Sequence, residues 1–240
     1  MFGAYQAGAW RALERVFRPD MVIGASAGAL NGWAIAGGIS ADELAESWLD
    51  PRTAALMRPR FPLRPWEGIF DSKPLAEKAR ELVERFTPAV PFAAAVVELP
   101  ALRLGLLRGE NMTWRHLMAA CAVPCGFPPV RLDGRLCVDG GLLSVLPLWA
   151  AGELGAGRVI AVNALPWMPS RLMRAAVGVV RRLRPPPPAP DLEVRLVCPE
   201  RPLGSLRDAI RWDAAKASEW IRLGEHDVEL MLCRSIGSIA

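Results

Sequence analysis

Hydrophobic residues follow two spacings along this chain, and segments with the two spacings alternate. Apolar side chains three or four positions apart share one face of a helix, and they predict helices at residues 4–17, 27–37, 41–49, 74–87, 113–122, 147–154 and 171–184. Short apolar runs predict strands at residues 21–23, 93–98, 103–107, 130–132, 136–138, 159–162 and 193–197. Strands that alternate with helices indicate an α/β fold around a mainly parallel sheet.

Short polar motifs predict several of the element ends. Asp133 and Gly134 separate two apolar runs, a pattern typical of a β-hairpin. Ser205 stands three residues before Asp208, the spacing of a capping box at the start of a C-terminal helix. Ser72 is the expected cap of the helix that follows it.

Prolines interrupt the pattern at two places. Residues 51–70 hold four scattered prolines among aromatic side chains, so we expect irregular structure there and a candidate lid or lipid port. Residues 185–188 are consecutive prolines, which form a stiff spacer. The part after this spacer is too short for a separate α/β domain, so we expect a single domain over residues 1–240.

The predicted helix at 171–184 is strongly amphipathic. One face carries Arg171, Arg174, Arg181 and Arg182, and the opposite face carries Leu172, Ala176, Val179 and Leu183. Two arrangements fit this pattern: the apolar face covers the sheet while the arginines are solvated, or the helix lies on anionic lipid. We expect the first.

Composition and charge narrow the class of protein. The chain has 240 residues, of which 52% are hydrophobic, and this content excludes a disordered chain. The net charge of +4 permits contact with an anionic surface but does not indicate nucleic-acid binding. Five cysteines form no disulfide framework, and no second pair accompanies Cys121 and Cys125, so no metal site is predicted.

Targeting signals are not evident in the sequence. The first ten residues lack a basic start followed by an apolar stretch. Residues 21–41 carry no charge, but their five glycines favour a strand, a turn and a helix over a membrane span. We therefore expect a cytoplasmic protein that can be peripheral to a membrane. The sequence does not indicate the oligomeric state.

The chemistry of the chain centres on a G-x-S-x-G motif at residues 24–28. The motif lies where a predicted strand meets a predicted helix, and a serine on such a sharp turn exposes its hydroxyl. The amide of Ala27 then faces a developing oxyanion, and the helix N-terminus favours negative charge. Ser26 is therefore the candidate nucleophile. The other interpretation is a tight turn whose small residues serve only packing.

A nucleophilic serine needs a base. The two histidines, His116 and His226, lie in a predicted first helical turn and in a polar C-terminal segment, so we expect capping or surface roles for them. Asp139 ends an apolar strand and is followed by Gly140 and Gly141, which makes it the candidate base. Its alternative role is an ordinary Asp-Gly turn.

These motifs together resemble the patatin-like phospholipase family. The resemblance rests on residues 24–31, on the Asp-Gly-Gly at 139–141 and on residues 122–124 and 127–130 before the hairpin. It extends to residues 3–8 and 204–206, nearly the whole chain. The family implies a three-layer α/β/α sandwich and hydrolysis of lipid esters by a serine–aspartate dyad without histidine. It implies a lipid ester as substrate and no metal or organic cofactor.

The resemblance also implies a role for each site residue. Ser26 matches the nucleophile and Asp139 the base; Gly24 and Gly28 match the nucleophile elbow, Gly140 and Gly141 the base loop, and Gly3 and Ala27 the oxyanion hole.

One departure from the family is marked. Its members begin with a strand and a glycine-rich loop, whereas here only the last glycine of that loop is present, as Gly3, and Phe2 stands where arginine is usual. We therefore expect a fold without the first strand, either because the true start lies upstream or because this is a shortened form. Two other functions stay open: a catalytically weak or inactive lipid-binding protein, and a nucleotide-binding α/β domain. The dinucleotide fingerprint and the phosphate-loop lysine of the latter are absent.

Overall fold

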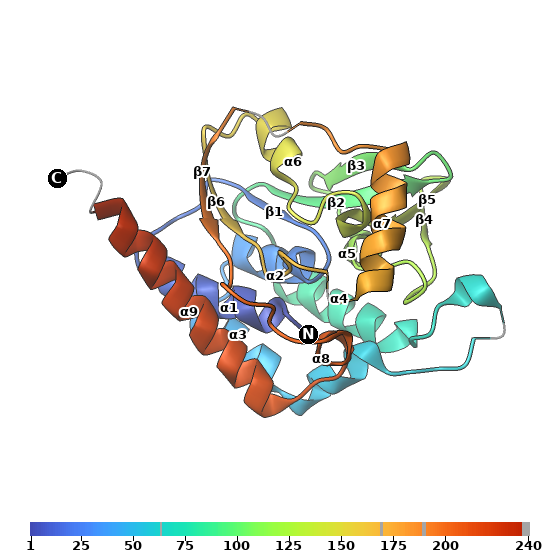
Figure 1. Ribbon diagram of the computed structural model, residues 1–240, viewed down its shortest axis with the longest axis horizontal. Coiled ribbons are helices and arrows are strands. Elements are labelled where there is room, and N and C mark those ends of the chain that lie inside the picture. The colour runs from blue at the N-terminus through green and yellow to red at the C-terminus, as the bar shows by residue number, and fades with distance from the viewer. Residues whose placement is uncertain (63, 169, 189–190, 237–240) are drawn as a thin grey trace.

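The computed structural model describes residues 1–62, 64–168, 170–188 and 191–236 (Figure 1). The strands are β1 (Val22–Gly24), β2 (Phe92–Leu99), β3 (Arg103–Arg108), β4 (Val130–Leu132), β5 (Arg135–Asp139), β6 (Arg158–Val162) and β7 (Glu193–Val197). The α-helices are α1 (Gly3–Leu13), α2 (Ala27–Ala36), α3 (Ala41–Leu49), α4 (Ser72–Arg85), α5 (Trp114–Ala120), α6 (Leu148–Glu153), α7 (Arg171–Leu183), α8 (Leu206–Ile210) and α9 (Ala214–Ile236). Three 3₁₀ turns complete the set: η1 (Pro51–Met57), η2 (Pro65–Glu67) and η3 (Gly140–Leu142).

The strands form a mixed five-stranded sheet and a separate two-stranded sheet. In the larger sheet β1 pairs with β2, β2 with β5 and β5 with β4, while β3 also pairs with β2. The expected parallel pairing occurs between β1 and β2 and between β6 and β7. The pairs β2–β3 and β4–β5 are antiparallel because a tight turn returns the chain between their strands, and β2–β5 is antiparallel as well.

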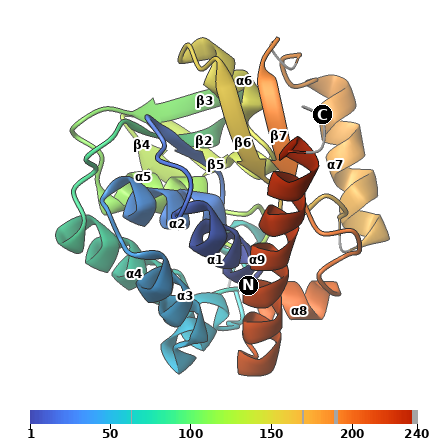
Figure 2. The same ribbon diagram turned by 90° about the vertical axis from the view of Figure 1, so that its left-hand side faces the viewer.

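Helices cover both faces of the larger sheet, so the fold is the three-layer α/β/α arrangement that the resemblance implies (Figures 1 and 2). Strand β2 shows why, since its residues 92–97 are buried on both faces. Ala94 and Val96 belong to the main core with α1, α2, α4 and α5. Ala95 packs with Trp149 of α6, and Val97 packs near Val180 of α7.

Helices α1 and α9 cross at close range. Any side chain at Gly8 would collide with the carbonyl of Ile221, and one at Gly224 would collide with the carbonyl of Tyr5. The buried Tyr5 hydroxyl donates a 2.6 Å hydrogen bond to Asp227. Two glycines, which allow the close approach, and the buried Tyr5–Asp227 hydrogen bond therefore hold α1 against α9.

The structure confirms the hairpin and one of the two expected caps. Asp133 and Gly134 take positive φ values of 45° and 79° between β4 and β5. The capping box of Ser205 and Asp208 is present, although it opens the short α8 and not the long C-terminal helix. The expected cap at Ser72 is wrong: Asp71 caps α4, accepting from the Lys73 amide, and Ser72 is already helical.

The expected orientation of α7, with its apolar face covering the sheet, is wrong. Val179 and Leu183, which the pattern assigned to the sheet-covering face, are 55% and 70% exposed. Val180 and Arg181 are the side chains turned toward the protein instead. The side chain of Leu172 lies outside the described residues. No helix in the described ranges is both long enough and apolar enough to cross a membrane.

Candidate active site

Ser26 and Asp139 stand at the ends of two strands, β1 and β5, that run in opposite directions along one edge of β2, while β3 pairs with the other edge. β1 is parallel to β2 and its last residue, Gly24, pairs with Ala94. β5 is antiparallel to β2 and its last residue, Asp139, pairs with Val96. The carboxyl ends of β1 and β5 therefore meet end to end beside Ala95, although they are far apart in the sequence.

The backbone at Ser26 makes a strained turn between β1 and α2. Ser26 has φ 54° and ψ −133°, a conformation that a residue with a side chain rarely adopts. A side chain at Gly24 would collide with the carbonyl of Gly28, so a glycine is needed at position 24 for the chain to close on itself, whereas a side chain at Gly28 would meet only the end of Gln6 at 3.3 Å. The Ser26 amide donates to the Ala120 carbonyl at 3.0 Å, which fixes the turn against the end of α5.

The Asp139 carboxylate is 3% exposed and accepts a hydrogen bond from the Gly141 amide at 2.8 Å. The Ser26 hydroxyl lies near enough for hydrogen bonding with it to lower the pKa of this carboxylate. A side chain at Gly140 would lie 2.5 Å from the Ala95 carbonyl. Gly140 and Gly141 therefore let the loop after β5 press against β2 and turn an amide toward the carboxylate.

Burial sets the proton affinity of this carboxylate. It raises the pKa of Asp139 from the ordinary 3.8 to about 6, although the hydrogen bonds from Ser26 and Gly141 act in the opposite direction. A carboxylate with this pKa is ionised at neutral pH and is a stronger base than a solvated aspartate. The arrangement can therefore accept a proton from the serine hydroxyl.

The two expected oxyanion-hole residues lie in different surroundings. Ala27 is the first residue of α2, so its N–H is one of those that the helix itself does not engage. Gly3 opens α1, and its carbonyl accepts a 3.0 Å hydrogen bond from Asn31, one helical turn beyond Ala27. Gln6 of α1 lies against Gly28. The N-termini of α1 and α2 are thus held together, with Ala27 adjacent to Ser26 and Gly3 beside the second turn of α2.

Two other reactive side chains, Cys121 and His116, have structural roles. The Cys121 thiol donates to the Ser26 carbonyl at 3.1 Å, and burial, followed by the charge of Asp139, raises the pKa of this thiol well above its ordinary value. His116 accepts from the Thr113 amide in a capping box, as its position in the sequence predicted. Among the described residues no cluster of three or more metal-binding side chains occurs.

Arg181 of α7 reaches the loop that carries Asp139. Its Nη2 donates to the Gly141 carbonyl at 3.4 Å, while its Nε is buried and has no hydrogen-bond partner among the described residues. Burial lowers the pKa of Arg181. The sequence placed Arg181 on a solvated face, and no spacing signal links it to a glycine 40 residues away.

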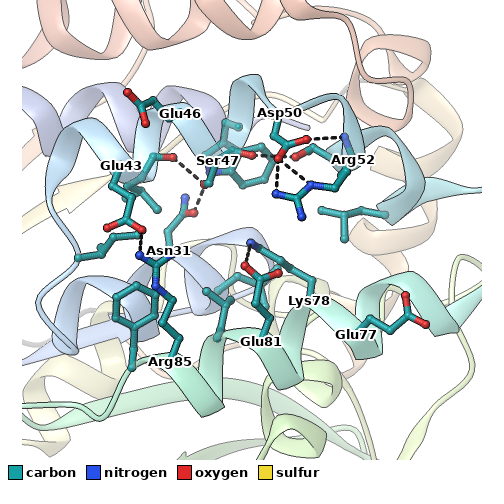
Figure 3. Close-up of a pocket in the computed structure, with 18 of the residues that line it drawn as sticks. Asn31, Glu43, Glu46, Ser47, Asp50, Arg52, Glu77, Lys78, Glu81 and Arg85 are labelled. Atoms are coloured by element: carbon teal, nitrogen blue, oxygen red, sulfur yellow. Dashed lines mark hydrogen bonds and ion pairs between the residues drawn. The ribbon is translucent and has the colours of Figure 1, made fainter.

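A cavity of about 550 Å³ lies elsewhere, between α3, η1 and α4 (Figure 3). Six of the charged side chains that line it form the ion pairs Arg85–Glu43, Lys78–Glu81 and Arg52–Asp50. Neither Ser26 nor Asp139 nor the glycines around them line it. The cavity is therefore separate from the candidate active site.

Comparisons with known proteins bear on the fold and the family. The patatin-like phospholipase family model matches residues 1–151. Among solved structures, VipD from Legionella pneumophila superposes with a TM-score of 0.54 at 12% sequence identity. The superposition covers 97% of this chain and 65% of that of VipD, so this chain spans less than two thirds of that protein.

Proposed function

The chain belongs to the patatin-like phospholipase family, and on that premise we propose that it hydrolyses carboxylic esters of lipids through an acyl-enzyme on Ser26 with Asp139 as base. Membership supports lipid acyl hydrolysis in general. The observation that carries the specific assignment is that the ends of β1 and β5 bring Ser26, on a strained strand-to-helix turn, beside the buried Asp139 carboxylate.

The first half of the proposed reaction forms the acyl-enzyme. Asp139 accepts the hydroxyl proton while Ser26 Oγ bonds to the ester carbonyl carbon, and the carbonyl oxygen becomes an oxyanion. The Ala27 amide and the N-terminus of α2 stabilise this negative charge, with Gly3 as the second candidate donor. The ester C–O bond then breaks, and the leaving alcohol takes the proton from Asp139.

The second half releases the fatty acid. Asp139 accepts a proton from a water molecule, whose oxygen attacks the acyl carbon, and Ser26 leaves with the proton returned to its Oγ. Because Gly141 holds one carboxylate oxygen at 2.8 Å, the carboxylate keeps its orientation through both halves. No step of this proposed reaction needs a metal or an organic cofactor.

The test of the proposed function is product analysis. The purified protein, incubated with mixed micelles of a phospholipid and a diacylglycerol, is expected to release free fatty acid from at least one of them, measured by mass spectrometry. Micelles incubated without protein supply the background. Binding of either lipid without release of fatty acid would contradict hydrolysis and favour the alternative of a non-catalytic lipid-binding protein.

The activity is expected to rise with pH through about 6, because Asp139 accepts a proton only in its ionised form and its pKa is about 6. Below this pH the value of kcat/KM for a soluble ester falls roughly tenfold per pH unit, since the fraction of ionised Asp139 falls at that rate. A pH profile of kcat/KM with a soluble p-nitrophenyl ester measures this fall. A flat profile between pH 4.5 and 7.5 would be incompatible with Asp139 as base.

A further inference from the structure

Helix α7 presents apolar side chains to solvent. Val179 and Leu183 are 55% and 70% exposed, and they lie one helical turn apart on the outer side of the helix. Ala175 and Ala176, exposed on the same side, widen this strip. Ordinary surface helices turn such a strip toward the core, so an outward apolar strip indicates that something covers it.

The charged side chains in the sequence around this strip are all basic. Residues 154–190 contain six arginines and no acidic residue. Arg171 and Arg182 are exposed and, at 100° per residue, flank the apolar strip on one edge. An apolar strip bordered by arginines complements a surface that has an apolar interior and anionic groups at its boundary.

The inner side of α7 rests on the catalytic loop. Val180 packs near Val138, Leu142 and Leu143, and Arg181 donates to the Gly141 carbonyl. Gly141 in turn donates to Asp139. A surface that covers the outer strip of α7 therefore lies across this helix from the loop that orients Asp139.

We propose that the outward strip of α7, with Arg171 and Arg182, docks on the surface of an anionic phospholipid membrane and holds the Ser26 site next to its lipid. The docking itself stands on the exposure and charge of α7, whereas its use in catalysis rests on the proposed function. A second exposed apolar set, Phe61 at 99% and Trp66 at 65%, lies in the loop around η2. That loop contacts neither η3 nor Asp139 through any described hydrogen bond, so α7 is the better-placed contact.

The test measures flotation with two kinds of vesicle, one of phosphatidylglycerol mixed with phosphatidylcholine and one of phosphatidylcholine alone. The full chain is expected to bind the anionic vesicles more tightly. The double variant Arg171→Gln/Arg182→Gln is expected to lose about twentyfold to thirtyfold in binding, because each arginine near an anionic surface contributes about fivefold. Val179→Ser/Leu183→Ser is expected to lose binding to a similar extent.

Arg15→Gln/Arg18→Gln is the matched control, since it removes two arginines at the end of α1, on the left of Figure 1, whereas α7 lies on the right. We expect this control to bind as the unaltered chain does. Undiminished binding of both α7 variants, or loss of binding only in Phe61→Ser/Trp66→Ser, would overturn the proposal. A concentration-dependent dimer that Val179→Ser/Leu183→Ser dissolves, without vesicle binding, would overturn it in favour of a second copy of the chain.

Activity assays separate this proposal from the proposed function. Both α7 variants are expected to hydrolyse a soluble p-nitrophenyl ester at the unaltered rate and to lose activity only on anionic vesicles. If the unaltered chain hydrolyses no ester at all, the proposed function fails while the flotation result still decides the docking. If the α7 variants keep their full activity on vesicles, docking through α7 does not serve catalysis.

Discussion

Ser26→Ala is expected to lower the hydrolysis of a soluble ester by roughly 10⁴-fold or more, because the variant lacks the oxygen that forms the acyl-enzyme. No neighbouring group can replace that oxygen. The Cys121 thiol is buried, stays protonated and donates to the Ser26 carbonyl. The initial rate of p-nitrophenyl ester hydrolysis is the measurement.

Two companion variants separate loss of chemistry from loss of folding. Ser144→Ala removes a hydroxyl that donates to the Leu146 carbonyl in the loop after η3, and it is expected to keep its activity within about twofold. Ser26→Gly relieves the positive φ of 54° and is expected to be at least as stable as the unaltered protein, yet as inactive as Ser26→Ala. Turnover by either Ser26 variant within about tenfold of the unaltered rate would remove Ser26 from the mechanism.

Asp139→Asn is expected to lower the rate of hydrolysis by roughly 10²–10⁴-fold and, at neutral pH, to stabilise the fold. The asparagine can still accept from the Gly141 amide, so the loop keeps its shape. It cannot take the proton of Ser26. The stability gain arises because the folded protein no longer buries an ionised carboxylate, whose pKa of about 6 lies above the ordinary 3.8.

The pH dependence of that gain has a definite sign. A group whose pKa is raised in the folded state binds its proton more tightly there, so its contribution to stability is complete below pH 3.8 and is lost as the pH rises through about 6. Two pKa units correspond to about 3 kcal/mol, which is the upper bound for the gain at pH 7.5. Urea unfolding of the unaltered protein and of Asp139→Asn at pH 4 and pH 7.5 measures this gain in stability. Lower stability of Asp139→Asn at pH 7.5 would contradict the buried charge.

The local parts of the fold could be predicted because local rules determine them. The turn at Asp133 and Gly134, the capping box at Ser205 and the histidine cap of α5 each follow from residues within four positions of one another. The sequence also singled out Ser26 and Asp139, and the structure places them near each other where β1 and β5 end beside β2. The resemblance supplied the pairing of these two residues, whereas periodicity alone could not, because it does not show how β1 and β5 are arranged along β2.

The orientation of α7 could not be predicted for a physical reason. Helical periodicity shows that a helix has an apolar side, but it does not show whether that side meets the protein or another surface. Here the inner contacts come from Val180 and from Arg181, whose long side chain reaches the Gly141 carbonyl. A contact between a helix and a loop that are far apart in the chain leaves no mark in the spacing of either.

The central claim is that Ser26 is a nucleophile activated by Asp139. A fluorophosphonate reacts covalently with such a serine, and peptide mapping by mass spectrometry locates the adduct. We expect a single adduct on the peptide that contains Ser26, absent in Ser26→Ala and formed much more slowly in Asp139→Asn. An adduct on another residue, or an equal rate of labelling in Asp139→Asn, would contradict the account.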